Sequence, residues 1–404
     1  MLTFDPETLE APAPFDPEAV IREARRRQRQ RWLISSAALI VVVASVAGAA
    51  AALAGGGSAQ PHHHATTPPP SPTVSPAPAP ATNSEPEAPG SLALASDGGL
   101  YIADASRNVI FERLADGTFR VVAGDGTPGF SGDGGPATAA EIDAPGAMAV
   151  APDGTLYFTA NTRVRAVLPT GTITTVAGDG RRGTWVSDGT PALDAHLLGA
   201  TSITLSPSGE LYIATGNQVL SLQPNGTLTN VLGHRGPYGG ISGIGGPAVD
   251  ASADGAAGLA FNAAADLFVF GSATKSVLMV TPQGMVSLVP GTIYPRGNGA
   301  LVPTPGGAVL AMNTTSIVRL TPQGEQTVMA FPTGPTPPDT YLGVENVAPV
   351  GIAVAPNRTI YFDTNPNDGY SNAAVIAAIS PDGKGVRLWR RGESVTTSPS
   401  QLGQ

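Results

Sequence analysis

One short pattern repeats along the C-terminal three quarters of the chain. A two-residue turn that ends in glycine recurs at intervals of 40 to 59 residues, and each turn follows a short run rich in Val, Ile and Leu. Self-similarity at such a spacing is typical of repeat architectures, and a turn of this kind between apolar runs is typical of a β-hairpin. The six turns are Asp116-Gly117, Thr170-Gly171, Asn225-Gly226, Gln283-Gly284, Gln323-Gly324 and Asp382-Gly383.

A second hairpin precedes each of these turns, and the second repeat shows it best. Its apolar run 147–150 leads into Pro152-Asp153-Gly154, which leads into the run 156–158. Each repeat therefore predicts four short antiparallel strands. Six such units predict an all-β, six-bladed propeller over residues 90–390, because radial stacking leaves only short sheet edges. We expect the run 385–389 to complete the sixth blade without a strand from the N-terminal side.

The alternatives to a propeller are a β-sandwich and an extended β-solenoid. A sandwich would not repeat six times, and a solenoid would have a shorter and more regular repeat. The 50 glycines and 39 prolines suit many tight turns and exclude a helical bundle. The absence of cysteine excludes disulfides, and the net charge of −9 argues against nucleic acid as a partner.

The N-terminal part of the chain predicts a membrane anchor. Residues 32–54 carry no charge and are long enough to cross a bilayer as one helix. The arginine-rich segment 1–31 precedes them, so the N-terminus is expected to be cytoplasmic and the C-terminus exported. The alternative is a cleaved signal peptide, because Ala52-Leu53-Ala54 resembles a cleavage site.

Two further segments have compositions that do not favour a folded core. Residues 55–89 are rich in Pro, Ala, Ser and Thr, which predicts a disordered, semi-extended stalk between the anchor and the propeller. Residues 391–404 follow the last repeat and are expected to be a disordered tail.

The amino-acid sequence of the repeats resembles that of the NHL family. The resemblance rests on Val122-Ala123-Gly124-Asp125-Gly126, on 130–137, on 145–157 and on Thr174-Thr175-Val176-Ala177-Gly178. It is specific in the first three repeats and degenerate in the last three. It looks like the NHL propellers of exported actinobacterial proteins and like the sensor domains of some bacterial receptor Ser/Thr kinases. The resemblance implies a propeller that binds proteins, nucleic acids or wall components, with lyases and other enzymes as a minority.

Long glycine-rich loops connect the first three repeats to the repeats that follow. They span residues 125–145, 179–198 and 233–257, whereas the connection after the fourth repeat is short. Aromatic residues beside arginine are typical of binding surfaces. We therefore expect a protein or cell-wall ligand to bind this loop-rich rim, through Phe130, Arg181, Arg182, Trp185 and Tyr238. The alternative is that these aromatic side chains only fold back onto their own loops.

Asp133 and Asp188 occupy corresponding places in the first two loops, and they have two interpretations. Carboxylates in a loop are potential calcium ligands. They are also common in structural turns, where Asp accepts hydrogen bonds from the backbone. Ile244 stands at this place in the third loop, which favours the structural interpretation.

The sequence shows no nucleophile elbow, zinc-binding helix or phosphate loop. No catalytic residue and no cofactor are therefore predicted. The preferred interpretation is a membrane-tethered, extracytoplasmic binding or sensor module. The alternative is an exported propeller lyase or hydrolase, which would have to use His196 or His234, the two histidines of the repeat region.

Overall fold

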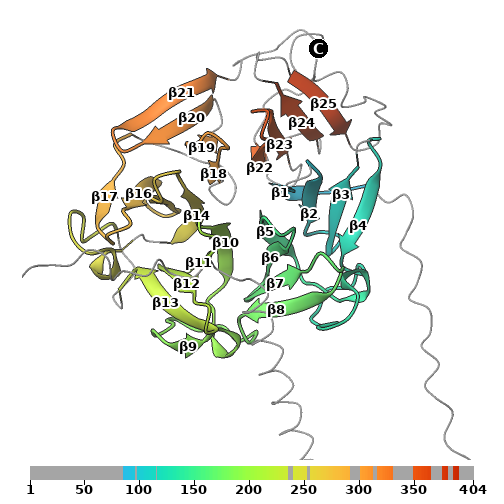
Figure 1. Cartoon of the computed structure of the whole chain (residues 1–404), viewed down its shortest axis with the longest axis horizontal. Coiled ribbons are helices and arrows are strands. Elements are labelled where there is room, and N and C mark those ends of the chain that lie inside the picture. Colours follow the sequence, from blue (N-terminus) through green and yellow to red (C-terminus); the bar gives the residue numbers. More distant parts are fainter. Residues whose placement is uncertain are drawn as a thin grey trace, which may run out of the picture.

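The computed structural model describes residues 85–95, 98–114, 116–234, 240–252, 255–291, 301–312, 316–330, 349–364, 375–380 and 385–390. These residues form six antiparallel sheets arranged around a common centre, five of four strands and one of five (Figure 1). The six-bladed propeller predicted from the repeats is confirmed. The first strand of every blade lies nearest the centre and the fourth lies at the periphery (Figure 1).

The strands follow one another in chain order within each blade. Blade 1 is β1 (Pro89–Leu94), β2 (Leu100–Asp104), β3 (Val109–Arg113) and β4 (Phe119–Ala123); blade 2 is β5 (Pro145–Val150), β6 (Leu156–Ala160), β7 (Arg163–Val167) and β8 (Ile173–Ala177). Blade 3 is β10 (Ala200–Leu205), β11 (Leu211–Thr215), β12 (Gln218–Leu222) and β13 (Thr227–Leu232); blade 4 is β14 (Ala256–Phe261), β15 (Leu267–Gly271), β16 (Ser276–Val280) and β17 (Val286–Leu288). Blade 5 is β18 (Leu301–Pro303), β19 (Val309–Met312), β20 (Ser316–Thr321) and β21 (Gly324–Ala330); blade 6 is β22 (Pro349–Val354), β23 (Ile360–Thr364), β24 (Val375–Ile379) and β25 (Gly385–Arg390).

The hydrophobic core lies between the blades and not within them. Among the described residues, each of six clusters of buried apolar side chains joins two neighbouring blades. Burial of apolar surface is the main favourable term in folding, so each blade depends on its neighbours for stability. One cluster joins Phe111 and Ile102 of blade 1 to Ile376 and Leu388 of blade 6. Because β25 completes blade 6, the ring closes as expected, without a borrowed strand.

The three long loops are clasps that join each of the first three blades to the next one. In the first loop, the Ala137 N–H donates to the carbonyl oxygen of Gly171 in blade 2. The Ala192 and Ala248 N–H groups make the same bond to Gly226 and Gly284, in blades 3 and 4. Each loop also contains one short 3₁₀ helix: η2 (Ala137–Ala139), η3 (Ala192–Asp194) and η4 (Ala248–Asp250). The residue just before each helix pairs with the outermost hairpin of the next blade, through Pro136, the short strand β9 (Thr190–Pro191) and Pro247.

The third clasp differs from the first two in its surface chemistry. Asp133 accepts a hydrogen bond from the Thr175 N–H at 3.1 Å, and Asp188 accepts one from the Asn230 N–H at 2.6 Å. In the third clasp, Ile244 takes the place of the aspartate. Ile244 is 44% exposed, and the other large apolar side chains exposed at this clasp are Val249, Met285 and Leu288.

Replacement of Ile244 by aspartate is expected to stabilise the protein. The new carboxylate would stand where Asp133 and Asp188 stand and would accept the N–H of Leu288, a bond that contributes about 1 kcal/mol. The urea midpoint of the full chain should rise. Val249→Asp is the matched control, since it removes a similarly exposed apolar side chain without the bond. Equal midpoints for the two variants would contradict the assignment.

Within the described residues, no helix is both long enough and apolar enough to span a membrane. The predicted anchor 32–54, the segment 1–31 and the tail 391–404 lie outside the described residues. The predicted stalk 55–89 lies outside them up to residue 84. The anchor and the stalk stay predictions.

Candidate functional site: a central cavity and a loop-built rim

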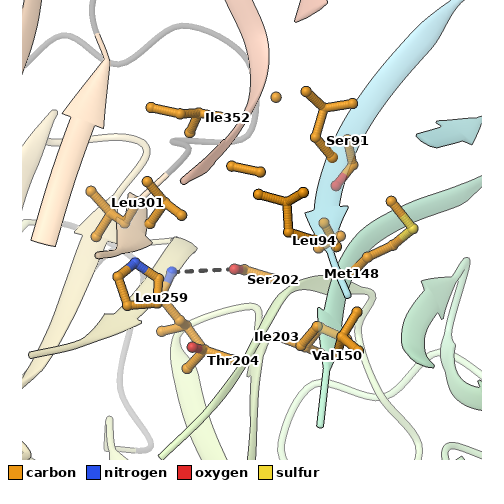
Figure 2. Close-up of a pocket in the computed structure, with 18 of the residues that line it drawn as sticks. Ser91, Leu94, Met148, Val150, Ser202, Ile203, Thr204, Leu259, Leu301 and Ile352 are labelled. Carbon is orange, nitrogen blue, oxygen red and sulfur yellow. Dashed lines mark hydrogen bonds between the residues drawn. The ribbon is translucent and has the colours of Figure 1, made fainter. Parts of the chain in front are cut away.

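The innermost strands of all six blades surround a central cavity of about 280 Å³ (Figure 2). Its lining is composed of small, hydroxyl-bearing and aliphatic side chains, among them Ser91, Met148, Ser202, Leu301 and Ile352. The Leu259 N–H donates a hydrogen bond to the Ser202 hydroxyl at 3.2 Å, drawn as a dashed line in Figure 2.

The described residues that line this cavity are uncharged. The described residues that line the cavity include no Asp, Glu, His, Lys, Arg or Tyr. General acid–base catalysis requires a group that can gain or lose a proton close to the substrate. The described lining supplies no such side chain, whereas the loops of the rim carry charged and aromatic side chains in contact with one another.

Phe130 lies in the first clasp and is held there by a cation–π contact. The guanidinium carbon of Arg163, at the start of β7, lies 3.7 Å from the centre of the Phe130 ring. Phe130 is nevertheless 44% exposed. Arg163 also donates to the carbonyl oxygen of Asp179 at 2.8 Å, so it joins the first loop to the start of the second. The ring is thus both pre-positioned and accessible.

Arg165 and Asp133 anchor the first clasp beneath Phe130. Their ion pair has an N–O distance of 2.7 Å, and the Arg165 side chain is 1% exposed. Arg165 further donates to the carbonyl oxygens of Ser131 and Glu141, at 2.7 and 2.9 Å. Together these bonds hold the two sides of the loop to β7. The Asp133 carboxylate thus bonds to blade 2, through the Arg165 side chain and the Thr175 N–H, and not to the backbone of its own turn.

The second clasp contains a histidine–aspartate pair. Nδ1 of His196 lies 3.0 Å from an Asp179 carboxylate oxygen, and the His196 side chain is half exposed. The other Asp179 oxygen accepts the backbone N–H of Arg181 at 2.8 Å. The Arg181 side chain is 81% exposed and lies 3.9 Å from the same carboxylate. This arrangement orients the imidazole and leaves the cationic end of Arg181 in solvent.

The remaining predicted site residues fall in three different settings. Trp185 is half-buried, and Arg182 is exposed beside it in the same loop. The backbone at Gly183 packs against His196, because a Cβ added there would lie 2.3 Å from the His196 carbonyl oxygen. Tyr238 lies outside the described residues.

We use the name rim surface for Phe130, Arg163, Asp179, Arg181, His196 and Trp185.

Three residues of the rim surface were not among the predicted binding residues: Arg163, Asp179 and His196. Arg163 and Asp179 are 16 residues apart in sequence and meet only because β7 and β8 pair. The sequence could have indicated Asp179, because the motif Val-Ala-Gly-Asp-Gly that contains Asp125 recurs with Asp179 at the same place. For the described residues, no cluster of three or more metal-ligating side chains is found, and neither Asp133 nor Asp188 is part of one.

The Asp179–His196 pair predicts a pH dependence of stability. Burial alone would raise the pKa of Asp179, but hydrogen bonds from the Arg181 N–H and the His196 ring outweigh it and hold the pKa below its usual value. A carboxyl whose pKa is lowered on folding stabilises the protein above its unfolded pKa of about 3.9, and this contribution is lost as the pH falls through the folded pKa. Between pH 6 and pH 3, the urea midpoint of Asp179→Asn should fall less than that of the wild type. Equal falls in the two proteins would contradict this assignment.

Comparison with solved structures finds propellers of several activities. Virginiamycin B lyase from Staphylococcus aureus is 14% identical, with 78% of this chain and 87% of that chain covered and a TM-score of 0.46. A gluconolactonase from Xanthomonas campestris is 12% identical over 70% and 84% of the two chains, with a TM-score of 0.46. A PQQ-bound aldose sugar dehydrogenase from Streptomyces coelicolor is 16% identical over 72% and 91%, with a TM-score of 0.44.

These solved neighbours are thus a lyase, a lactonase and a dehydrogenase, all distant in sequence. No family model matches the chain, and no curated protein matches it. The resemblance to NHL repeats therefore stays a prediction.

Proposed function

We propose that this protein is a binding module that engages a protein or cell-wall ligand through the rim surface. In this proposal residues 32–54 anchor the chain in the membrane, and the stalk holds the propeller outside the cell. The observation that carries the proposal is the accessibility of the Phe130 ring. The side chain is 44% exposed, although the guanidinium carbon of Arg163 lies 3.7 Å from the ring centre and holds the ring in place. Exposed aromatic and arginine side chains that are fixed before binding lose little entropy when a ligand arrives.

Co-sedimentation of the full-length protein with purified cell wall tests the proposal. The double variant Phe130→Ala, Trp185→Ala is expected to weaken binding at least tenfold, because loss of a buried aromatic contact costs about 1 to 2 kcal/mol. Val328→Ala is the matched control, since Val328 is 50% exposed on β21 of blade 5, away from the three clasps. Equal binding by the wild type and the double variant would overturn the proposal.

A lyase or hydrolase acting at the rim is the second candidate function. It is favoured by the 3.0 Å contact between His196 and Asp179, in which the carboxylate orients the imidazole as in a general base. The test is the release of soluble fragments from the same cell-wall preparation. Release by the wild type, lost in His196→Ala and kept in His234→Ala, would support this candidate. An absence of release would leave the binding proposal as it stands.

A further inference from the structure

One buried arginine lies at the seam where the ring closes, between blades 6 and 1. Arg113 is the last residue of β3 and stands opposite Leu100, the first residue of β2. Alternate residues of a strand share a face, so Arg113 lies on the same face of blade 1 as Phe111. Phe111 packs in the cluster that joins blade 1 to blade 6. Arg113 is only 7% exposed, so a cation is held inside this seam.

The other five blades carry no charge at this register. Each equivalent residue belongs to an apolar cluster between two neighbouring blades; the five are Val167, Leu222, Val280, Leu320 and Ile379. An apolar side chain therefore meets the packing needs of a blade at this position. The fold itself does not require a charge here, which points to a separate role for Arg113.

Two nitrogen atoms of the Arg113 guanidinium, Nε and Nη2, are buried and have no hydrogen-bond partner among the described residues. They form one edge of the guanidinium, and such an edge binds two oxygen atoms of a carboxylate or phosphate through parallel hydrogen bonds. Asp116, in the turn that follows β3, does not fill this edge. Its carboxylate accepts the N–H and the hydroxyl of Thr118, at 2.9 and 2.6 Å.

Tyr361 of β23 borders Arg113 from the side of blade 6. Its ring packs against the same cluster, and its hydroxyl can donate a third hydrogen bond. Burial lowers the pKa of Arg113 and raises the pKa of Tyr361, and each side chain opposes the shift of the other, so the two lie close together. The turn of blade 1 borders the guanidinium as well, because a Cβ added to Gly117 would lie 3.4 Å from Nη2.

We propose that Arg113 and Tyr361 form a binding site for a small oxyanion at the seam between blades 6 and 1. Nε and Nη2 of Arg113 bind two oxygen atoms of a carboxylate or phosphate group, and the Tyr361 hydroxyl donates to the same group. The anion neutralises a buried charge and connects the first blade to the last. It binds the closed ring and not the unfolded chain, so it stabilises the closed ring. This site is separate from the rim surface and goes beyond the proposed function.

Urea unfolding of the full-length protein in sodium phosphate, in sodium acetate and in sodium chloride of equal ionic strength tests this proposal. An anion at about ten times its dissociation constant should lower the unfolding equilibrium constant about tenfold relative to chloride. A response to phosphate alone assigns a phosphate group, and a response to acetate assigns a carboxylate. Tyr361→Phe should weaken the affinity for the anion about fivefold, the effect of one lost hydrogen bond.

Arg113→Leu is the decisive variant, because it introduces the residue that blades 3 and 5 carry at this register. It should abolish the response to both anions. Its urea midpoint in chloride should exceed that of the wild type, since an apolar residue replaces a buried charge that has no partner. Equal responses of the wild type and Arg113→Leu would overturn the proposal. A lower midpoint of Arg113→Leu in chloride would show that Arg113 already has a partner within the protein, and would overturn it as well.

The double variant Phe130→Ala, Trp185→Ala separates this site from the rim surface. It should respond to the anions as the wild type does, because neither residue lies at the seam between blades 6 and 1. Loss of the anion response in this variant would contradict the assignment of the site to Arg113. Its binding to cell wall tests the proposed function alone.

Discussion

Replacement of Asp133 by alanine is expected to lower the free energy of unfolding by about 3 kcal/mol. The variant leaves the guanidinium of Arg165, whose side chain is 1% exposed, without its 2.7 Å counter-ion. Removal of one partner of a buried ion pair costs about 3 to 5 kcal/mol, and the carbonyl oxygens of Ser131 and Glu141 place this case at the lower end. Urea unfolding of the full-length protein measures the effect.

Asp188→Ala is the matched control for this variant. Asp188 is exposed at the equivalent position, and its carboxylate accepts the N–H of Asn230. The position equivalent to Arg165 in blade 3 is Leu220, which carries no charge. Asp188→Ala should therefore cost only about 1 kcal/mol. If both variants cost the same, the Asp133–Arg165 pair does not anchor the first clasp.

Replacement of Gly178 by alanine is expected to cost about 4 kcal/mol, the other large effect on stability. Gly178 has a φ of +88°, which places it in a region that L-residues rarely adopt. A Cβ added there would also lie 2.2 Å from the backbone carbonyl oxygen of Thr162. Backbone atoms must shift to relieve this contact. The free-energy cost of that shift adds to the cost of the positive φ, which is about 1 to 2 kcal/mol.

The control for Gly178 is Gly171, in the turn between β7 and β8. Gly171 has a φ of +78°, but a Cβ added there would meet nothing within 4 Å. Gly171→Ala should therefore show only the cost of the positive φ, about 1 to 2 kcal/mol. Equal costs for the two substitutions would show that close packing of the clasp on β7 does not contribute.

The repeats predicted the architecture because each hairpin carries its own local signal. Asp-Gly turns and apolar runs recur, so the strands and their number follow from the sequence. The signal weakens in the later blades, yet the turns form there as well. Ala265 and Arg358 adopt positive φ values of 61° and 67° where glycine would be expected. Tertiary packing of the neighbouring strands evidently outweighs the local preference at these two turns.

The candidate site was predicted only in part, since its partners come from different blades. Phe130 and Arg181 were predicted because aromatic residues are scarce in this chain and an aromatic residue beside arginine is typical of a binding surface. The position of Arg163 over Phe130 depends on how the first loop crosses onto blade 2, which no local pattern encodes. The same holds for the contact of Arg165 with Asp133, 32 residues apart in the chain. The sequence motif predicted a turn at Asp133. Only the packing of the first loop on blade 2 shows that Arg165 is the partner of its carboxylate.

Hydrogen–deuterium exchange of the full-length protein, with and without solubilised cell wall, tests the central claim most directly. If the rim surface is the binding site, protection should appear in peptides that cover residues 125–145 and 179–198. The strands that line the central cavity, including β1, β10 and β22, should exchange as in the free protein. Protection of those strands, with unchanged exchange in the two loops, would place the ligand in the cavity and contradict the account.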